Sequence, residues 1–100
     1  MKVTTEQNDA KTFVKLEGRV DTTTATQFQT DLEPLMMGDF QDIEIDCSGL
    51  EYTSSQGLRV FLMFQKCVNK RGGTLVLKNM RPEVKEVFDI TGFSNIIRIA

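Results

Sequence analysis

Three hydroxyl residues in a row, Thr53, Ser54 and Ser55, stand directly before a long apolar segment. That segment has the pattern of a helix, and the first backbone N–H groups of a helix have no partner within the helix. These groups and the positive end of the helix dipole stabilise a hydroxyl oxygen or a phosphate. A serine here is therefore a helix N-cap or a phosphate acceptor, and the residue types alone leave both roles open.

A second polar cluster stands earlier in the chain, where Asp21 is followed by three threonines, beginning with Thr22. Aspartate and threonine are favoured at helix starts, so we expect Asp21 to cap a helix. Each cluster follows a predicted strand and opens a predicted helix. Because functional loops of parallel sheets lie beyond the carboxyl ends of the strands, we expect the loops at 18–24 and 47–57 to be neighbours.

Segments rich in β-favouring residues predict the strands that end at these loops. The expected strands are residues 2–6, 12–16, 42–46, 74–78 and 96–99. Turn-forming residues at 7–10 join the first two strands into a hairpin, and Gly18 is expected to end the second strand.

Apolar residues at three- and four-residue spacing predict helices between the later strands. The first follows Asp21 and stops at Gly38, and Pro34 should kink it or break its last turn. The second spans residues 55–69, and the third occupies residues 82–92.

The order of these elements, β-β-α-β-α-β-α-β, predicts one α/β domain over residues 1–100. After the opening hairpin, alternating helices and strands give a mixed, largely parallel sheet with right-handed crossovers and helices packed on it. A chain of 100 residues suits a single hydrophobic core. The short edge strands favour a monomer.

The second predicted helix is unusually apolar, so much of its surface belongs in the core. Its basic residues form a narrow stripe: Arg59, Lys66 and Lys70. Val60, Met63 and Phe64 flank this stripe and are candidates, together with Arg59, for a surface that faces a partner. A solvated stripe is the simpler interpretation, and a docking surface for an acidic partner is the alternative.

Composition argues against several functional classes. The net charge of −2 gives no basic field for nucleic acid, and no apolar run is long enough to predict a membrane span. The polar N-terminus lacks the apolar stretch of a signal peptide, so we expect a cytoplasmic protein. Cys47 and Cys67 are too far apart to suggest a zinc site, and we expect buried reduced thiols, no metal and no cofactor.

Several segments together carry a family resemblance. They are Gly18-Arg19-Val20-Asp21, residues 45–58, residues 72–77 and residues 82–93. The first is similar to a G-x-[LVI]-D motif, and the second is similar to a signature strand and loop that usually ends D-S-x-G-[LIV]. Both motifs are those of the STAS domain, the family of bacterial anti-sigma factor antagonists. The resemblance covers nearly the whole chain and implies the STAS fold.

The resemblance also implies a phosphorylation switch. In that family, the unphosphorylated antagonist binds an anti-sigma factor serine kinase and frees a sigma factor. The kinase then phosphorylates a serine two residues before the motif glycine, which breaks the complex, and a serine phosphatase would reset the switch. By position the phosphoacceptor is Ser55, two residues before Gly57, and Asp21 matches an aspartate that is needed for phosphorylation. The resemblance places these further residues in the partner loop: Thr22, Thr53, Ser54, Gln56 and Gly57.

The chain departs from the family pattern just before the acceptor, where Ser54 stands in place of the usual aspartate. Some relatives also have serine at this place. The change makes Ser54 an alternative acceptor, and it removes one negative charge that the kinase would meet.

Two functional classes agree with these features. The favoured one is a phosphorylation-switched anti-sigma factor antagonist, and the alternative is an unphosphorylated STAS interaction module of another signalling or transport complex. A receiver-like module phosphorylated on Asp46 would need an acidic pair and a late lysine to hold a metal and the acyl phosphate. An enzyme is disfavoured, because the sequence has no histidine and no G-x-x-x-x-G-K phosphate loop.

Overall fold

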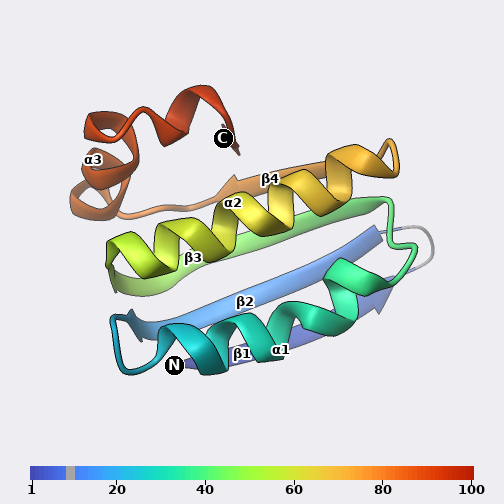
Figure 1. Ribbon diagram of the computed structural model, residues 1–100, viewed down its shortest axis with the longest axis horizontal. Helices are drawn as coiled ribbons and strands as arrows, with labels where there is room; N and C mark the ends of the chain where they lie inside the picture. The colour runs from blue at the N-terminus through green and yellow to red at the C-terminus, as the bar shows by residue number, and fades with distance from the viewer. Residues whose placement is uncertain (9–10) are drawn as a thin grey trace.

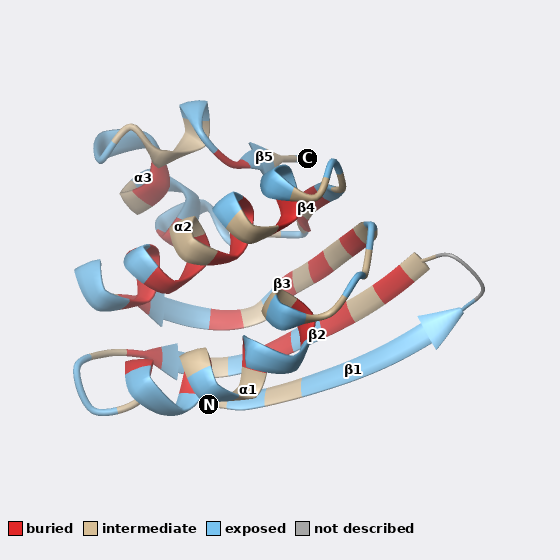
Figure 2. Cartoon of the chain, turned by 45° about the vertical axis from the view of Figure 1, so that its right-hand side comes forward, coloured by how far each residue is buried: buried red, intermediate tan, exposed pale blue. Residues whose placement is uncertain are grey.

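The computed structural model describes residues 1–8 and 11–100, and within them five strands form one sheet in the order β1-β2-β3-β4-β5. Figure 1 shows the first four strands with the helices, and β5 is labelled in Figure 2. The strands are β1 (Lys2–Asn8), β2 (Lys11–Val20), β3 (Asp42–Thr53), β4 (Thr74–Lys78) and β5 (Arg98–Ile99). The helices are α1 (Ala25–Met37), α2 (Ser55–Lys70) and α3 (Pro82–Ile90), and a 3-10 turn, η1, covers Phe93–Asn95.

The topology confirms the predicted α/β domain with an opening hairpin. β1 is antiparallel to β2, whereas β2, β3, β4 and β5 pair in parallel with their neighbours. Each parallel pair is joined through a helix, and the right-handed crossovers favoured by strand twist place successive helices on one face. α1 and α2 accordingly lie side by side on one face of the sheet, and α3 follows on the other side of α2 from α1 (Figure 1).

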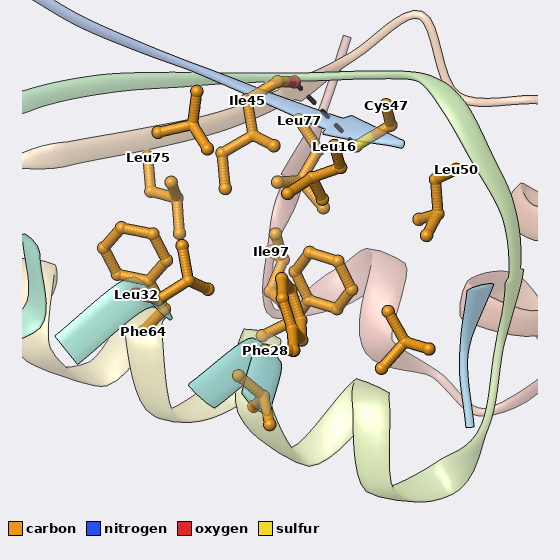
Figure 3. Close-up of a cluster of buried hydrophobic side chains, with 14 of the residues drawn as sticks. Leu16, Phe28, Leu32, Ile45, Cys47, Leu50, Phe64, Leu75, Leu77 and Ile97 are labelled. Carbon is orange, nitrogen blue, oxygen red and sulfur yellow. Dashed lines mark hydrogen bonds between the residues drawn. The ribbon is translucent and has the colours of Figure 1, made fainter. Parts of the chain in front are cut away.

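The core lies between this sheet face and the helices. Phe61 of α2 packs edge-on against Phe28 of α1 and Phe88 of α3, with ring centroids 5.2 and 5.5 Å apart. Ile45 and Leu77 supply the sheet side, and Cys47 lies beside them, its thiol donating to the Ile45 carbonyl at 3.8 Å (Figure 3). One aromatic cluster therefore ties the three helices to the sheet.

The opposite sheet face is polar. Glu44 of β3 forms ion pairs with Lys11 of β2 at 3.4 Å and with Lys78 of β4 at 2.9 Å. The edge strand β1 is almost wholly exposed (Figure 2). None of the helices within residues 1–8 and 11–100 combines the length and hydropathy needed to cross a bilayer.

The strands β2 and β3 are several residues longer than predicted, because irregular pairing carries them past residues that ordinarily end a strand. β2 continues through Gly18, whose φ of +112° accommodates a register shift against β3, and ends at Val20. β3 continues past Asp46 to Thr53, and a Cβ on Gly49 would come within 2.6 Å of the Leu16 carbonyl oxygen. The glycines allow the close backbone approach that keeps the strands paired.

Other predicted boundaries also change. The hairpin turn was predicted over residues 7–10, but Gln7 and Asn8 belong to β1 and residues 9–10 lie outside the described residues. The last strand is only Arg98–Ile99, because the N–H groups of Ile96 and Ile97 donate to the Phe93 carbonyl in the turn that follows η1. Pro34 was predicted to kink the helix or to break its last turn, and the last turn is unbroken, because α1 continues past the proline to Met37. Gly38 follows as predicted, and its N–H donates to the Pro34 carbonyl at 3.1 Å.

Candidate functional site

The two polar clusters meet at the carboxyl edge of the sheet, as predicted. Val20 at the end of β2 pairs with Thr53 at the end of β3. One residue further, the Ser54 N–H donates to the Val20 carbonyl at 2.8 Å. Because both strands are longer than predicted, the connections shrink to residues 21–24 before α1 and to Ser54 before α2. The site is thus built from two tight turns on paired strands.

Asp21 organises the first turn through one carboxylate oxygen. Its Oδ1 accepts from the Thr23 hydroxyl at 2.6 Å, from the Thr23 N–H at 2.9 Å and from the Thr24 N–H at 3.1 Å. The Thr23 hydroxyl, with the backbone bonds, holds the pKa of this carboxyl below its ordinary value. Asp21 therefore caps the turn that leads into α1, whereas the N-cap position itself is Thr24. The neighbouring Thr22 is exposed.

Ser54 is the N-cap of α2. Its backbone is extended, with φ −93° and ψ 177°, and its Oγ accepts from the Gly57 N–H at 3.2 Å. This is the bond that a capping side chain makes to the third helical residue. The hydroxyl oxygen of Ser54 is therefore engaged in holding the helix start.

Ser55 is the first residue of α2 and is exposed. Its hydroxyl donates to the Gln56 side-chain carbonyl at 3.3 Å, and Gln56 is exposed as well. This bond joins two surface side chains, so it does not cap the helix. The structure thus separates the two serines that the sequence left as alternatives: Ser54 caps the helix and Ser55 presents its hydroxyl to solvent.

Gly57 is required by the close packing of the α2 start on the ends of β2 and β3. A Cβ at this position would come within 2.4 Å of the Thr53 hydroxyl oxygen and 2.7 Å of a Val20 methyl group. Thr53 lies underneath, only 3% exposed, with its hydroxyl donating to the Ser54 carbonyl at 3.2 Å. The prediction that Thr53 belongs to the partner-facing loop is therefore wrong, because the helix start covers it.

The partner surface predicted on α2 also needs correction. Val60 is 3% exposed and Phe64 is fully buried, so neither can contact a partner. Both side chains belong to the hydrophobic core, whereas Arg59 is exposed and Met63 is partly exposed. Only the stripe side of the predicted surface is accessible.

The structure adds a pair that sequence reasoning missed. The Arg19 guanidinium lies over the Tyr52 ring, 4.6 Å from its centroid, and the two residues are paired across β2 and β3. Both are exposed beside the two turns. Arg19 and Tyr52 both lie beyond the predicted strand ends at Gly18 and Asp46. The predicted strands therefore gave no cross-strand register for these two residues.

Comparison with known proteins agrees with this architecture. A family model for the STAS domain matches residues 2–100. BtrV of Bordetella bronchiseptica is 35% identical over 100 residues, which cover all of this chain and 86% of the relative. The anti-sigma-B factor antagonist of Bacillus subtilis is 35% identical over 98 residues, covering 98% of this chain and 89% of the relative.

Solved structures show the same fold. The anti-sigma factor antagonist SpoIIAA in its unphosphorylated form superposes with a TM-score of 0.80 at 20% identity, over 99% of this chain and 88% of that chain. The phosphorylated form of SpoIIAA, a Bacillus protein, gives a TM-score of 0.74 at 18% identity, over 99% and 91% of the two chains. The family match, the curated relatives and the shared fold agree, and the chain belongs to the STAS domain family, which includes anti-sigma factor antagonists.

Proposed function

We propose that this chain is a cytoplasmic anti-sigma factor antagonist that is switched by phosphorylation of Ser55. In the unmodified state it binds an anti-sigma factor serine kinase and so releases a sigma factor. The observation that carries the proposal is the exposed hydroxyl of Ser55, which lies beside a different serine that caps the helix. The curated relative named an anti-sigma-B factor antagonist supports the partner class.

The proposed reaction makes this chain the substrate and the kinase the catalyst. The Ser55 Oγ attacks the γ-phosphorus of ATP, the bond to ADP breaks, and the hydroxyl proton passes to a base of the kinase. The product carries about −1.5 to −2 charges at neutral pH, and the unpaired N–H groups of the α2 start stabilise them. The phosphate therefore alters the surface without unfolding the helix, as the existence of a structure of phosphorylated SpoIIAA illustrates for a relative.

The neighbouring turn has a defined role in this proposal. The hydrogen bonds from Thr23 fix the Asp21 carboxylate and favour its charged form at neutral pH. Held beside the start of α2, this carboxylate forms part of the surface that the kinase recognises, together with Thr22, Gln56 and the serines. It also repels a phosphate on Ser55, which adds to the loss of fit in the phosphorylated complex.

The acceptor is tested by site-resolved mass spectrometry after incubation with ATP and a soluble lysate of the source cells. We expect phosphate on Ser55 in the parent chain and in Ser54→Ala, and no phosphate in Ser55→Ala. Loss of the cap should cost Ser54→Ala about 1 kcal/mol, so circular dichroism must first show that this variant is folded. Modification of Ser54 instead would assign the switch to the capping serine. If the chain captures an active kinase and neither serine is modified, the unphosphorylated interaction module is correct.

The switch itself is tested by the affinity for the captured kinase. Ser55→Ala should bind like the parent chain, because the cap on Ser54 is intact. Ser55→Asp should bind at least tenfold more weakly, which corresponds to about 1.4 kcal/mol. Equal affinities of the two variants would contradict the mechanism.

A further inference from the structure

The exposed side of α2 is basic in a chain of net charge −2. The charged residues of α2 are Arg59, Lys66 and Lys70, all exposed. By contrast, the charged residues of α1 are Asp31 and Glu33, and α3 carries three acidic residues and one lysine. An exposed face with positive charges and no carboxylate of its own complements a carboxylate-rich partner surface.

Ser55 lies at the N-terminal end of this basic face. Successive spacings of four, four, three and four residues place one line of side chains along the helix, which we call the α2 stripe: Ser55, Arg59, Met63, Lys66 and Lys70. Residues with these spacings are neighbours on a helix surface. A phosphate on Ser55 would therefore be added to the end of the stripe itself.

Arg59 is the stripe residue within reach of that phosphate. Residues four apart on a helix have Cβ atoms about 5–6 Å apart, and long helical side chains lean toward the N-terminus, which brings a guanidinium at position 59 within reach of position 55. No ion pair or side-chain hydrogen bond within residues 1–8 and 11–100 engages the Arg59 guanidinium. The flat guanidinium matches the geometry of a phosphate and binds it through two parallel N–H bonds.

We propose that Arg59 binds a carboxylate of the partner kinase while Ser55 is unmodified, and that a phosphate on Ser55 takes this guanidinium away by binding it within the same chain. The inference rests on the proposed function and deepens it. Phosphorylation then has two effects at one end of the α2 stripe: it introduces negative charge, and it neutralises the arginine that held the partner. The switch requires no change in the backbone.

The intrachain pair is tested without the kinase, on the full chain carrying a genetically encoded phosphoserine at position 55. A phosphoserine loses its second proton at a pH of about 6, and an adjacent cation favours the doubly charged form. In a ³¹P NMR titration we expect the second pKa to be about half a unit lower in the parent sequence than in Arg59→Gln. The helix dipole and Asp21 act equally in both chains, so the difference isolates Arg59.

Lys70→Gln provides the matched control for this titration. It removes one positive charge from the same stripe, but it lies about 22 Å from Ser55 along the helix, beyond the screening length of about 8 Å at physiological salt. Lys70→Gln should therefore titrate like the parent sequence. Arg59→Lys, which keeps the charge and loses the planar fork, should give an intermediate pKa. Identical titrations for the parent sequence and Arg59→Gln would overturn the proposed pair.

The partner side of the proposal is tested by a double-mutant cycle with the kinase that modifies Ser55. Arg59→Gln should weaken binding of the unphosphorylated chain about tenfold. Phosphorylation should then weaken Arg59→Gln at least threefold less than it weakens the parent chain, because the shared arginine is already missing. Independent, additive effects would overturn the sharing of Arg59. Absence of any kinase that modifies Ser55 would instead contradict the proposed function, and the NMR result would stand on its own.

Discussion

At the scale of single residues, two adjacent serines have different roles: Ser54 caps α2, and Ser55 is exposed. The family pattern usually has aspartate at position 54, and a serine oxygen can accept the same N–H bond from the third helical residue. Ser54 therefore preserves the geometry of the helix start, as its bond to Gly57 shows, while one charge is absent. The departure from the family pattern thus changes the electrostatics of the site and leaves its cap in place.

Residue types alone could predict that serines open α2, but they could not assign the cap to Ser54. A serine one position earlier or later is equally able to cap, and the assignment depends on where β3 ends. Thr53 shows the same limit, because its burial follows from the helix start that packs over it. The family resemblance named Ser55 as acceptor, and this assignment stays a prediction that mass spectrometry can test.

Asp21 gives a prediction about acid stability. Its folded-state pKa is lowered by the hydrogen bonds from Thr23, so its contribution to stability is present above its unfolded pKa of about 4. The contribution is lost as the pH falls through the lower, folded value. Asp21→Asn keeps an acceptor oxygen and does not titrate. The difference in melting temperature between the parent chain and Asp21→Asn should be constant above pH 5 and shrink toward pH 3.

The effects of the other acidic groups that titrate in this pH range cancel when the melting temperatures of the two chains are subtracted. Glu44, Asp46 and Asp89 also have lowered pKa values in the folded chain, and they are present in both variants. If the two melting temperatures instead change in parallel with pH, the charge on Asp21 makes no pH-dependent contribution to stability.

At the scale of elements, periodicity predicted the helices well and the long strands poorly. The first part of β3 buries Ile43, Ile45 and Cys47 at two-residue spacing, whereas its second part buries Leu50 and Thr53 at three-residue spacing. Pairing with β2 continues through this change by shifts of register. Alternation in the sequence therefore fades where the strand becomes irregular, although the backbone remains paired.

Arg71 links two elements in a way that the sequence did not predict, because its position indicated only a turn. α1 has no basic residue in its last turn, and Arg71, just beyond the end of α2, supplies one. Its guanidinium donates to the carbonyl groups of Leu35 at 2.8 Å, Met36 at 2.9 Å and Phe40 at 2.7 Å. One side chain thus satisfies the unpaired end of α1 and ties it to the α2–β4 turn.

Arg71→Lys should lower the free energy of unfolding by about 2 kcal/mol, because an ammonium on a flexible chain cannot satisfy the three carbonyl groups together. Urea denaturation followed by circular dichroism measures the change. Lys70→Met is the control, since it removes a neighbouring exposed positive charge and should change stability by less than about 0.5 kcal/mol. Equal losses in the two variants would mean that positive charge near the end of α2, and not the fork of Arg71, stabilises this region.

At the scale of the whole molecule, the accessible partner surface depends on packing that no local pattern contains. Val60 flanks the basic stripe in sequence, yet it is buried in the core between the sheet and the helices. The two cysteines differ for the same kind of reason. Both were predicted to be buried, but Cys47 is fully covered by the helices, whereas Cys67, on α2, is only partly buried. Which positions stay accessible is decided when all the elements are assembled.

Cys47 therefore provides a probe of the assembled core. Burial, with a smaller effect of the Asp46 charge, raises the pKa of its thiol to about 12, so almost none of the reactive thiolate forms near neutral pH. It lies on β3 among side chains that contact the three helices. In a Cys67→Ser background, a thiol reagent should label Cys47 only from the unfolded state.

The labelling experiment decides whether the domain opens as one unit. If it does, the logarithm of the Cys47 labelling rate should rise linearly with urea, with the same slope as the global free energy of unfolding. The single cluster formed by Phe28, Phe61 and Phe88 argues for this result, since β3 cannot be exposed unless helix packing is lost. Labelling that is fast and independent of urea would instead show that β3 opens locally. In that case the strand leading to Ser54 and Ser55 would be a flexible part of the switch, and the fixed-backbone mechanism proposed for Arg59 would need revision.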